Sequence, residues 1–462
     1  MANPERPYPS FITSDRFIPA RFVRPAQRFA EIEASSGIVL LAAAIIALIW
    51  ANAPFGETYE AFWSTHLDFS VGPLHLEETL REVVNDGLMA IFFFVVGLEI
   101  KRELVLGELR DPRAAALPAI AAVGGMVVPA LIYVLFVGGG PGANGWGIPM
   151  ATDIAFSIGV VALLGSRVPV GAKLFLLTVA VADDIGAISV IAVFYTQDLH
   201  IGFLIGAIVG LFVMWLGQRW HIRSLVFYVP LGFLIWFLLL ESGVHATLAG
   251  VAIGLLTPAR PYLNSEHFDR QARRILDIYP VGDDSAQDRE KVDHEARMLS
   301  AVAIESIAPL NRLEHSLAPW SSFAIVPLFA LANAGVTFRG TPLGDAVTHP
   351  IALGVGFGLV VGKIFGISIA TYIAARLGIG KLPRGVTWNH VIGVSALAGI
   401  GFTVSLFITE LAFSDPVLAD RAKVGIFAGS LVAGLVGAAW LRWRGESRRH
   451  DDTVSEPAKA LA

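Results

Sequence analysis

The sequence predicts an all-α, polytopic membrane protein with about twelve transmembrane helices. Of its 462 residues, 55% are hydrophobic and only 16% are charged, whereas soluble domains carry about 25% charged residues. A helix needs about 20 apolar residues to cross a bilayer, and apolar stretches of roughly that length recur along the chain. The sequence contains no cysteine, which excludes disulfides, thiolate catalysis and cysteine-bound metals.

The predicted spans comprise residues 36–52, 84–106, 115–137, 146–164, 173–195, 201–217, 224–240, 243–257, 317–337, 350–374, 387–411 and 422–441. A cytoplasmic N-terminal extension at 1–34 and a disordered cytoplasmic tail at 443–462 leave 35–442 as the transmembrane domain. Within that domain we expect an extracytoplasmic β-hairpin at 58–80 and a long, partly helical cytoplasmic loop at 258–316.

Basic residues are distributed unevenly between the two sides of the predicted membrane. If the N-terminus is cytoplasmic, the inside loops hold most Lys and Arg, whereas the outside loops "GGGPGAN" and "TQDLH" hold none. The positive-inside rule then places both termini in the cytoplasm. The few basic residues left outside are Arg81, Arg339, Arg421 and Lys423.

Two adjacent acids, Asp183 and Asp184, lie in the middle of the fifth span, "FLLTVAVADDIGAISVIAVF". Each ionised side chain at the bilayer centre costs roughly 2.5–3.5 kcal/mol, so the pair must find partners or line a water-filled cavity. Successive helical residues are about 100° apart, so both can border one cavity without making the same contacts. We interpret the pair as a functional site; a satisfied structural hydrogen-bond pair is the alternative.

Two other spans carry signals of a broken helix. The fourth contains Pro149, which cannot donate a backbone hydrogen bond, followed by Thr152 and Asp153. The eleventh contains Gly399 and Gly401 in "AGIGFT". An early and a late break of this kind are typical of inverted repeats with two discontinuous helices. The alternative for the fourth span is a Pro-kinked helix in which Asp153 caps the second half.

Lys363 lies in the middle of the tenth span, where a buried ammonium needs a carboxylate partner or must lose its proton. The carboxylates, the Thr hydroxyl and free carbonyls together are hard oxygen donors, which suit Na⁺ or Li⁺ and disfavour copper or zinc. Protons and cations would compete for the same carboxylates, which favours an ion exchanger that needs no cofactor. Whether Asp183 or Lys363 would carry a second proton stays open.

Several motifs resemble those of the NhaA family of Na⁺/H⁺ antiporters over roughly residues 30–445. They are "NDGLMAIFFFVVGLEIKREL", "MATDIAFSIGVVALLG", "VADDIGAISVI", "GVHATLAG", "NRLEH", "PLFALANAGV" and "AGIGFT". The resemblance implies twelve helices with two broken helices that cross at mid-membrane. It also implies electrogenic exchange of about two H⁺ for each Na⁺ or Li⁺ exported. Further implications are pH regulation, a role in sodium and pH homeostasis, a bacterial inner membrane and a homodimer.

The resemblance also assigns roles to particular residues. It implies that Asp184 is the main cation ligand, that Asp183 is a second ligand or a proton carrier linked to Lys363, and that Thr152 and Asp153 compensate the broken helix ends. A weaker association with pH response falls on Glu99, Glu103, His245, Arg312, Glu314 and His315. For Glu99 and Glu103, pairing with a neighbouring Lys or Arg at a solvated helix end is an equal alternative. Asp86 is predicted to cap the second span.

Three other functions are less consistent with the sequence. An intramembrane aspartyl protease places its acids on separate helices in Tyr-Asp and Gly-x-Gly-Asp settings, which none of Asp153, Asp183 and Asp184 shows. A passive channel would need a carbonyl-filter sequence, which this chain does not contain, and Lys363 would oppose free cation flow. A Na⁺-coupled symporter of an organic solute is the nearest alternative. We therefore expect a transporter of Na⁺ and H⁺, neither an enzyme nor a nucleic-acid-binding protein.

Overall fold

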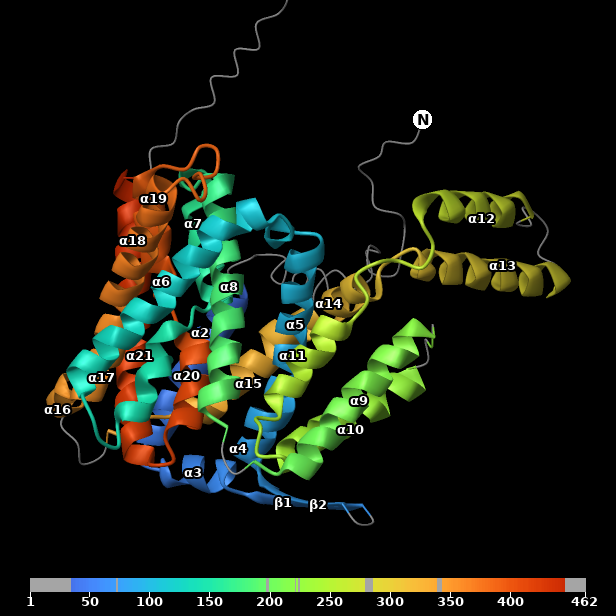
Figure 1. The fold of residues 1–462 in the computed structure, drawn as a ribbon. Coiled ribbons are helices and arrows are strands. Elements are labelled where there is room, and N and C mark those ends of the chain that lie inside the picture. The colour runs from blue at the N-terminus through green and yellow to red at the C-terminus, as the bar shows by residue number, and fades with distance from the viewer. Residues whose placement is uncertain are drawn as a thin grey trace, which may run out of the picture.

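The computed structural model describes residues 35–71, 74–196, 199–220, 222, 225–278, 286–338 and 343–444. Its helices are α2 (Ser35–Asn52), α3 (Glu57–Trp63), α4 (Leu80–Glu82), α5 (Met89–Val105), α6 (Pro112–Val137), α7 (Ile154–Leu164), α8 (Val170–Phe194), α9 (Ile201–Arg219), α10 (Leu225–Glu241), α11 (Thr247–Leu256), α12 (Ser265–Ile278), α13 (Ala286–Glu305), α14 (Pro309–Trp320), α15 (Val326–Asn333), α16 (Leu343–Thr348), α17 (Pro350–Phe357), α18 (Lys363–Arg376), α19 (Trp388–Leu397), α20 (Phe402–Ala412) and α21 (Pro416–Arg444). Two strands, β1 (His66–Val71) and β2 (Leu74–Thr79), form one antiparallel hairpin (Figure 1).

The described part of the chain contains nine helical segments long and apolar enough to cross a membrane. The pair α19 and α20, bent by 48°, raises the number to ten, and α10 and α11 are shorter apolar helices. The chain is therefore a nearly all-helical, multi-pass membrane protein, as predicted. The count of twelve spans and the inverted repeats stay predictions.

Turns of wide, π-type helix interrupt several spans: η2 (Val83–Leu88) precedes α5, η6 (Ser321–Ile325) joins α14 to α15, and η7 (Gly358–Gly362) joins α17 to α18. The last of these ends directly before Lys363. Such turns contain one residue more than an α-helical turn and are frequent at functional sites. Asp86 lies inside η2, so it does not cap the second span; Thr79 caps it instead, in a capping box with Glu82.

The helices pack through several cores rather than one. A large core runs under α2, α5, α15, α20 and α21, and a second lies between α6, α8, α18, α19 and α21. A third, smaller core joins α9, α10 and α11; α9 and α10 stand apart from the main body, whereas α11 packs against α5 (Figure 1). Glycines allow the backbones to touch: a Cβ on Gly366 of α18 would lie 2.2 Å from the carbonyl oxygen of Gly124 in α6.

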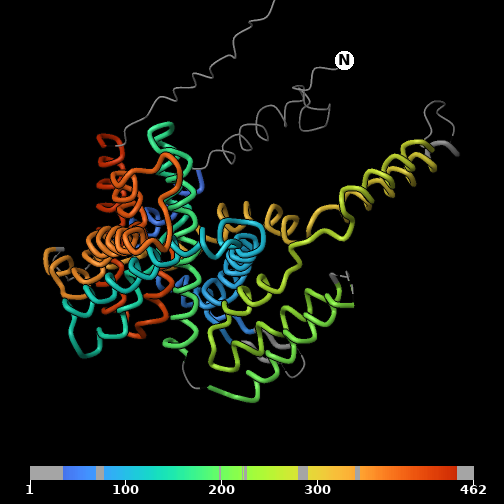
Figure 2. Tube along the Cα trace, turned by 45° about the horizontal axis from the view of Figure 1, so that its top comes forward, coloured from blue at the N-terminus to red at the C-terminus, as the bar shows by residue number. Residues whose placement is uncertain are grey.

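The hairpin and the α12–α13 pair lie at opposite ends of the molecule. The hairpin lies beside α3 and α4 at the bottom of Figure 1, where Arg81 forms an ion pair of 2.8 Å with Glu60. α12 and α13 fill most of the predicted 258–316 loop and project beyond the bundle (Figure 2). They pack on each other around Leu263, Ile275 and Val302. The predicted 1–34 extension and most of the 443–462 tail lie outside the described residues.

Candidate functional site

Two membrane spans are interrupted near their centres, and the two interruptions contact each other. In the first, the short 3₁₀ helix η4 (Ala143–Met150) contains Pro149, and three extended residues separate it from α7. In the second, residues 398–401 separate α19 from α20. The backbone N–H of Asp153 donates to the carbonyl of Ile400 at 2.6 Å. Backbone groups freed by one break are thus satisfied by the other, as a low-dielectric environment requires.

Asp153 connects the two broken helices. It is the N-cap of α7, because its Oδ1 accepts the backbone N–H of Phe156 at 3.1 Å. Its Oδ2 accepts the backbone N–H of Thr403 at 3.1 Å and also the Thr403 hydroxyl. The carboxylate therefore lies at the N-terminal ends of α7 and α20, where helix dipoles favour negative charge. The cap by Asp153, which the alternative for the fourth span included, is thus present, but in a span that is broken rather than only kinked.

Lys363 lies beside the first break with no exposed surface. Its Nζ is 2.5 Å from Oδ2 of Asp183 and 3.0 Å from Oγ1 of Thr152, and it also donates to the carbonyl of Met150. The Thr152 Oγ1 is itself 2.8 Å from Asp183 Oδ2 and 2.8 Å from the Ala398 carbonyl. The side chains of Lys363 and Asp183 are 0% and 1% exposed, so this ion pair is shielded from water.

Asp184 differs from Asp183 in having no fixed partner. Within the described residues its carboxylate makes no hydrogen bond or ion pair, although the residue is only 8% exposed. It borders an enclosed cavity of about 10 Å³, lined by apolar side chains that include Phe92, Phe93 and Ile188. That volume holds roughly one water-sized sphere. In the same part of the chain, Oδ1 of Asp183 is buried without a hydrogen-bond partner. Oxygens of both acids are thus free to bind a small ligand.

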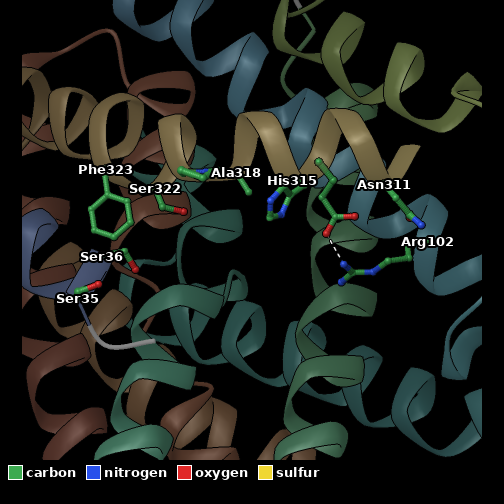
Figure 3. Close-up of a pocket in the computed structure, with 10 residues that line it drawn as sticks. Ser35, Ser36, Arg102, Asn311, His315, Ala318, Ser322 and Phe323 are labelled. Atoms are coloured by element: carbon green, nitrogen blue, oxygen red, sulfur yellow. Dashed lines mark hydrogen bonds and ion pairs between the residues drawn. The ribbon is translucent and has the colours of Figure 1, made fainter. Parts of the chain in front are cut away.

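A separate cluster of charges lines a wider cavity beside α5 and α14. Arg102 pairs with Glu314, while its other nitrogens lie 3.9 Å from Glu99 and 4.0 Å from Glu103. The cavity has a volume of about 490 Å³. Figure 3 shows Arg102 at one side of it, with His315 nearby. Other residues that line the cavity are Ser35, Ser36, Asn311, Ala318, Pro319, Ser322 and Phe323.

The structure thus separates the residues associated with pH response. Three of them, Glu99, Glu103 and Glu314, surround Arg102, which is one of the neighbouring basic residues that the alternative interpretation of Glu99 and Glu103 allowed. Of the other three, His315 lines the same cavity as Arg102, whereas His245 Nε2 lies 2.8 Å from the Tyr195 carbonyl and Arg312 donates to the Ile304 carbonyl at 3.4 Å.

Sequence reasoning did not identify Thr403 as the partner of Asp153, nor Arg102 as the centre of the second cluster. The first contact joins residues 250 positions apart and the second joins residues 212 positions apart. A hydroxyl directly after the Gly-rich break was the one available signal for the first. Among the described residues, no group of three or more His, Cys, Asp and Glu side chains is arranged to hold a metal ion.

Comparison with known proteins finds matches to almost the whole membrane-spanning part of the chain. The family model described as "Na+/H+ antiporter 1" matches residues 27–441. A protein from Oleidesulfovibrio alaskensis named "Na(+)/H(+) antiporter NhaA" is 46% identical over 428 residues, which cover 91% of this chain and 94% of that protein. One of the same name from Koribacter versatilis is 44% identical over 444 residues, 95% of this chain and 96% of its own. A Myxococcus xanthus protein named "Na(+)/H(+) antiporter NhaA 2" is 46% identical over 423 residues, 91% and 89% of the two chains.

The matched region includes both broken spans, the two adjacent acids and Lys363. With a family model over most of its length and relatives that are 44–46% identical over nine-tenths of it, this chain belongs to the Na⁺/H⁺ antiporter 1 family.

Proposed function

We propose that this chain is a secondary Na⁺/H⁺ antiporter that exports Na⁺ or Li⁺ and takes up protons, for sodium and pH homeostasis. The observation that carries the proposal is the pair of adjacent acids at the contact between the broken helices. One acid is held by Lys363 and the other has no partner among the described residues. The names of the relatives, each a Na⁺/H⁺ antiporter, support the same function.

The geometry supports competition between a cation and protons for Asp183 and Asp184. A cation that enters beside Asp184 would meet that carboxylate and the unpaired Oδ1 of Asp183. The hydroxyl of Thr152, within 2.8 Å of Asp183, would supply a neutral oxygen. These are hard donors, which select Na⁺ or Li⁺ over softer cations. Protonation of the carboxylates removes their charge and releases the cation, which completes the exchange.

Lys363 makes the exchange electrogenic in this proposal. While the cation is absent, its ammonium neutralises Asp183 at 2.5 Å. When the cation takes its place, the ion pair breaks and the Lys363 ammonium gives up a proton. In the alternative, Asp183 is protonated while the cation is absent and gives up that proton instead. Together with Asp184, about two protons then move against one cation, so the membrane potential drives export. The Arg102 cluster and its cavity would adjust the pH range of transport, because its three acids share one guanidinium.

We further propose that the protein lies in a bacterial inner membrane as a homodimer, with both termini cytoplasmic. The distribution of Lys and Arg supports the orientation. The small size of the cavity beside Asp184, about 10 Å³, supports an ion over the organic solute of a symporter.

Inside-out vesicles from an antiporter-deficient host test the function directly. With the vesicle interior acidified and a pH-sensitive dye present, addition of Na⁺ or Li⁺ should collapse the proton gradient. Asp184→Asn should abolish the response, whereas Asp277→Asn, the same change at an exposed position of α12, should leave it intact. A folded, membrane-inserted wild type that gives no response at any pH would overturn the proposal, and Na⁺-coupled solute uptake would be measured next.

Stoichiometry and the pH range need separate assays. In proteoliposomes, the membrane potential at which Na⁺ flux reverses gives the number of protons exchanged. If the direction of Na⁺ flux does not change at any membrane potential, electrogenic exchange is contradicted. Arg102→Gln should shift the pH range of the vesicle response while leaving a response to Na⁺ at its new optimum.

A further inference from the structure

A groove runs along the outer surface of the bundle between α17 and α21, away from the acids and the Arg102 cavity. Its volume is about 220 Å³, and its lining is apolar. α21 contributes Val424, Gly425, Ala428, Gly429 and Val432, and the facing wall comes from α16, α17 and η7. The absence of large side chains at three of these positions of α21 creates the hollow. No element of the described chain covers it, so its occupant comes from outside.

Arg421 continues the same face of α21 at one end of the groove. The lining residues of α21 follow it at i+3, i+4, i+7, i+8 and i+11, the spacing that places residues on one side of a helix. On the opposite wall, His349 caps the start of α17, two residues after Val347, which lines the groove. A basic residue from each wall therefore lies at the same end of an apolar groove.

Both basic side chains have hydrogen-bond donors available. Among the described residues, Arg421 makes no hydrogen bond or ion pair, in contrast to nearby Lys423, which pairs with Glu410 at 2.8 Å. His349 Nδ1 accepts the backbone N–H of Ile351 at 3.3 Å, which assigns the proton of a neutral ring to Nε2. Partial burial, and then the positive charge of Arg421, lower the pKa of His349, so the two side chains are close enough to interact.

This basic end lies where lipid headgroups are expected. It belongs to the hairpin end of the bundle, because Asp420, next to Arg421, accepts the backbone N–H of Thr337 just after α15. From Val424 to Val432 the groove extends eight residues along α21, or about 12 Å at 1.5 Å per residue. One leaflet of the hydrocarbon core is about 15 Å deep, half of the ~30 Å of the whole. The groove thus matches one leaflet in length and orientation.

We propose that the groove between α17 and α21 is a phospholipid site, with the phosphate held by Arg421 and His349 and an acyl chain between the helices. A guanidinium binds phosphate through two parallel hydrogen bonds, and the His349 Nε2–H adds a third donor. The site also accounts for Arg421, one of the few basic residues that the positive-inside rule leaves on the outside. The inference does not depend on the proposed transport function, since it rests on this surface alone.

Native mass spectrometry of the full-length protein, released from detergent, measures how much of each probe stays bound. The probes are dioleoylphosphatidylglycerol, dioleoylglycerol with the same chains but no phosphate, and inorganic phosphate. We expect the wild type to retain the phospholipid and neither of the other probes. Arg421→Gln should weaken retention about tenfold, because a charge-assisted hydrogen bond contributes about 1.4 kcal/mol or more. His349→Asn keeps the helix cap but loses the Nε2 donor, and should weaken retention by a smaller factor.

One further variant and two controls separate the contribution of the groove from that of the charge. Ala428 is exposed, so Ala428→Phe fills the hollow from outside without overpacking the core, and should also lower retention. The controls are Leu435→Phe, an exposed position of α21 beyond the groove, and Arg376→Gln, which removes a charge beside Tyr372 on α18. Both should bind phospholipid like the wild type.

Several results would overturn the inference. Retention unchanged in both Arg421→Gln and Ala428→Phe would show that the bound lipid sits elsewhere. Equal retention of dioleoylglycerol would remove the role of the phosphate, and equal binding of inorganic phosphate would remove that of the groove. A change from dimer to monomer in Ala428→Phe, with phospholipid retained, would identify the groove as a contact between two copies of the chain.

Discussion

Replacing Asp183 by Asn removes the only carboxylate held by Lys363 in the described structure. The ammonium then keeps two neutral partners, the Met150 carbonyl and the Thr152 hydroxyl. Breaking a buried ion pair by removing one partner costs about 3–5 kcal/mol. A second estimate gives a similar upper limit on the lost stability. A lysine has an ordinary pKa of about 10.4, so releasing its proton at pH 7 costs about 4.6 kcal/mol. The variant should lose stability up to that limit.

The assay is the free energy of unfolding in mixed detergent–SDS micelles, measured at pH 7 and pH 9. At pH 7 we expect Asp183→Asn to lose about 3–5 kcal/mol. At pH 9 the limit set by proton release falls by about 2.7 kcal/mol, so the loss should shrink. The double variant Asp183→Asn/Lys363→Met should recover much of the stability, with a coupling free energy of about 2–3 kcal/mol.

The reasoning fails if the loss is the same at both pH values, or if the double variant is no more stable than Asp183→Asn. The pair between Lys423 and Glu410 supplies a control. Its separation is 2.8 Å, but its side chains are 10% and 21% exposed. Water therefore screens the charge left behind, and Glu410→Gln should cost less than Asp183→Asn.

Three other predictions concern the helix contacts and the hairpin. Thr403→Val removes the hydroxyl donor to Asp153 and should cost about 1.5–3 kcal/mol of unfolding free energy while weakening the vesicle response to Na⁺. Gly250→Ala would place a Cβ 2.0 Å from the Ala90 carbonyl oxygen, so α11 must move from α5 at a cost of about 1–3 kcal/mol in the same unfolding assay. Burial, and then neighbouring negative charge, raise the pKa of Glu78 from 4.5 to about 7. The folded state therefore holds a proton that the unfolded chain has released, and stability falls as pH rises between these values; in Glu78→Gln, the melting temperature should not show this fall.

Matched variants decide each of these predictions. Thr403→Ser keeps the hydroxyl and should restore what the valine loses; if it does not, the hydrogen bond is not the cause. Gly232→Ala meets its nearest atom at 3.7 Å and should be tolerated, and equal damage from both glycine changes would exclude the close contact as the reason. Glu77→Gln, at the exposed neighbouring position, should retain the pH dependence of the wild type.

The broken spans could be predicted because their signals are local. Pro149 cannot donate to a helix, and Gly399 and Gly401 weaken one, so short windows of sequence sufficed. The contact of Lys363 with a carboxylate could also be predicted, because a buried ammonium has few other partners. The residue pattern alone left the choice of carboxylate open, since it depends on how three separate spans pack; only the family resemblance linked Lys363 to Asp183.

Other features were beyond sequence reasoning for the same physical cause. The π-type turns have no distinctive residues, because they arise where packing favours an extra residue over a regular α-helical turn. Asp86 was wrongly predicted as a cap because a short acid near the start of an apolar run resembles one. Thr79, seven residues earlier, takes that role, since the helix begins before the apolar run does.

The wide turn η7, which ends directly before Lys363, gives the tenth span one residue more than regular α-helical winding uses. Deleting Val361 would let η7 close to a regular α-helical turn, which leaves Lys363 on the same face of the helix relative to α17. Inserting a residue there instead would add about 100° of rotation and turn the ammonium away from Asp183, although no side chain at the site had changed. A single-residue insertion in this turn should therefore be as damaging as substitution of Lys363 itself, whereas the deletion should be far milder.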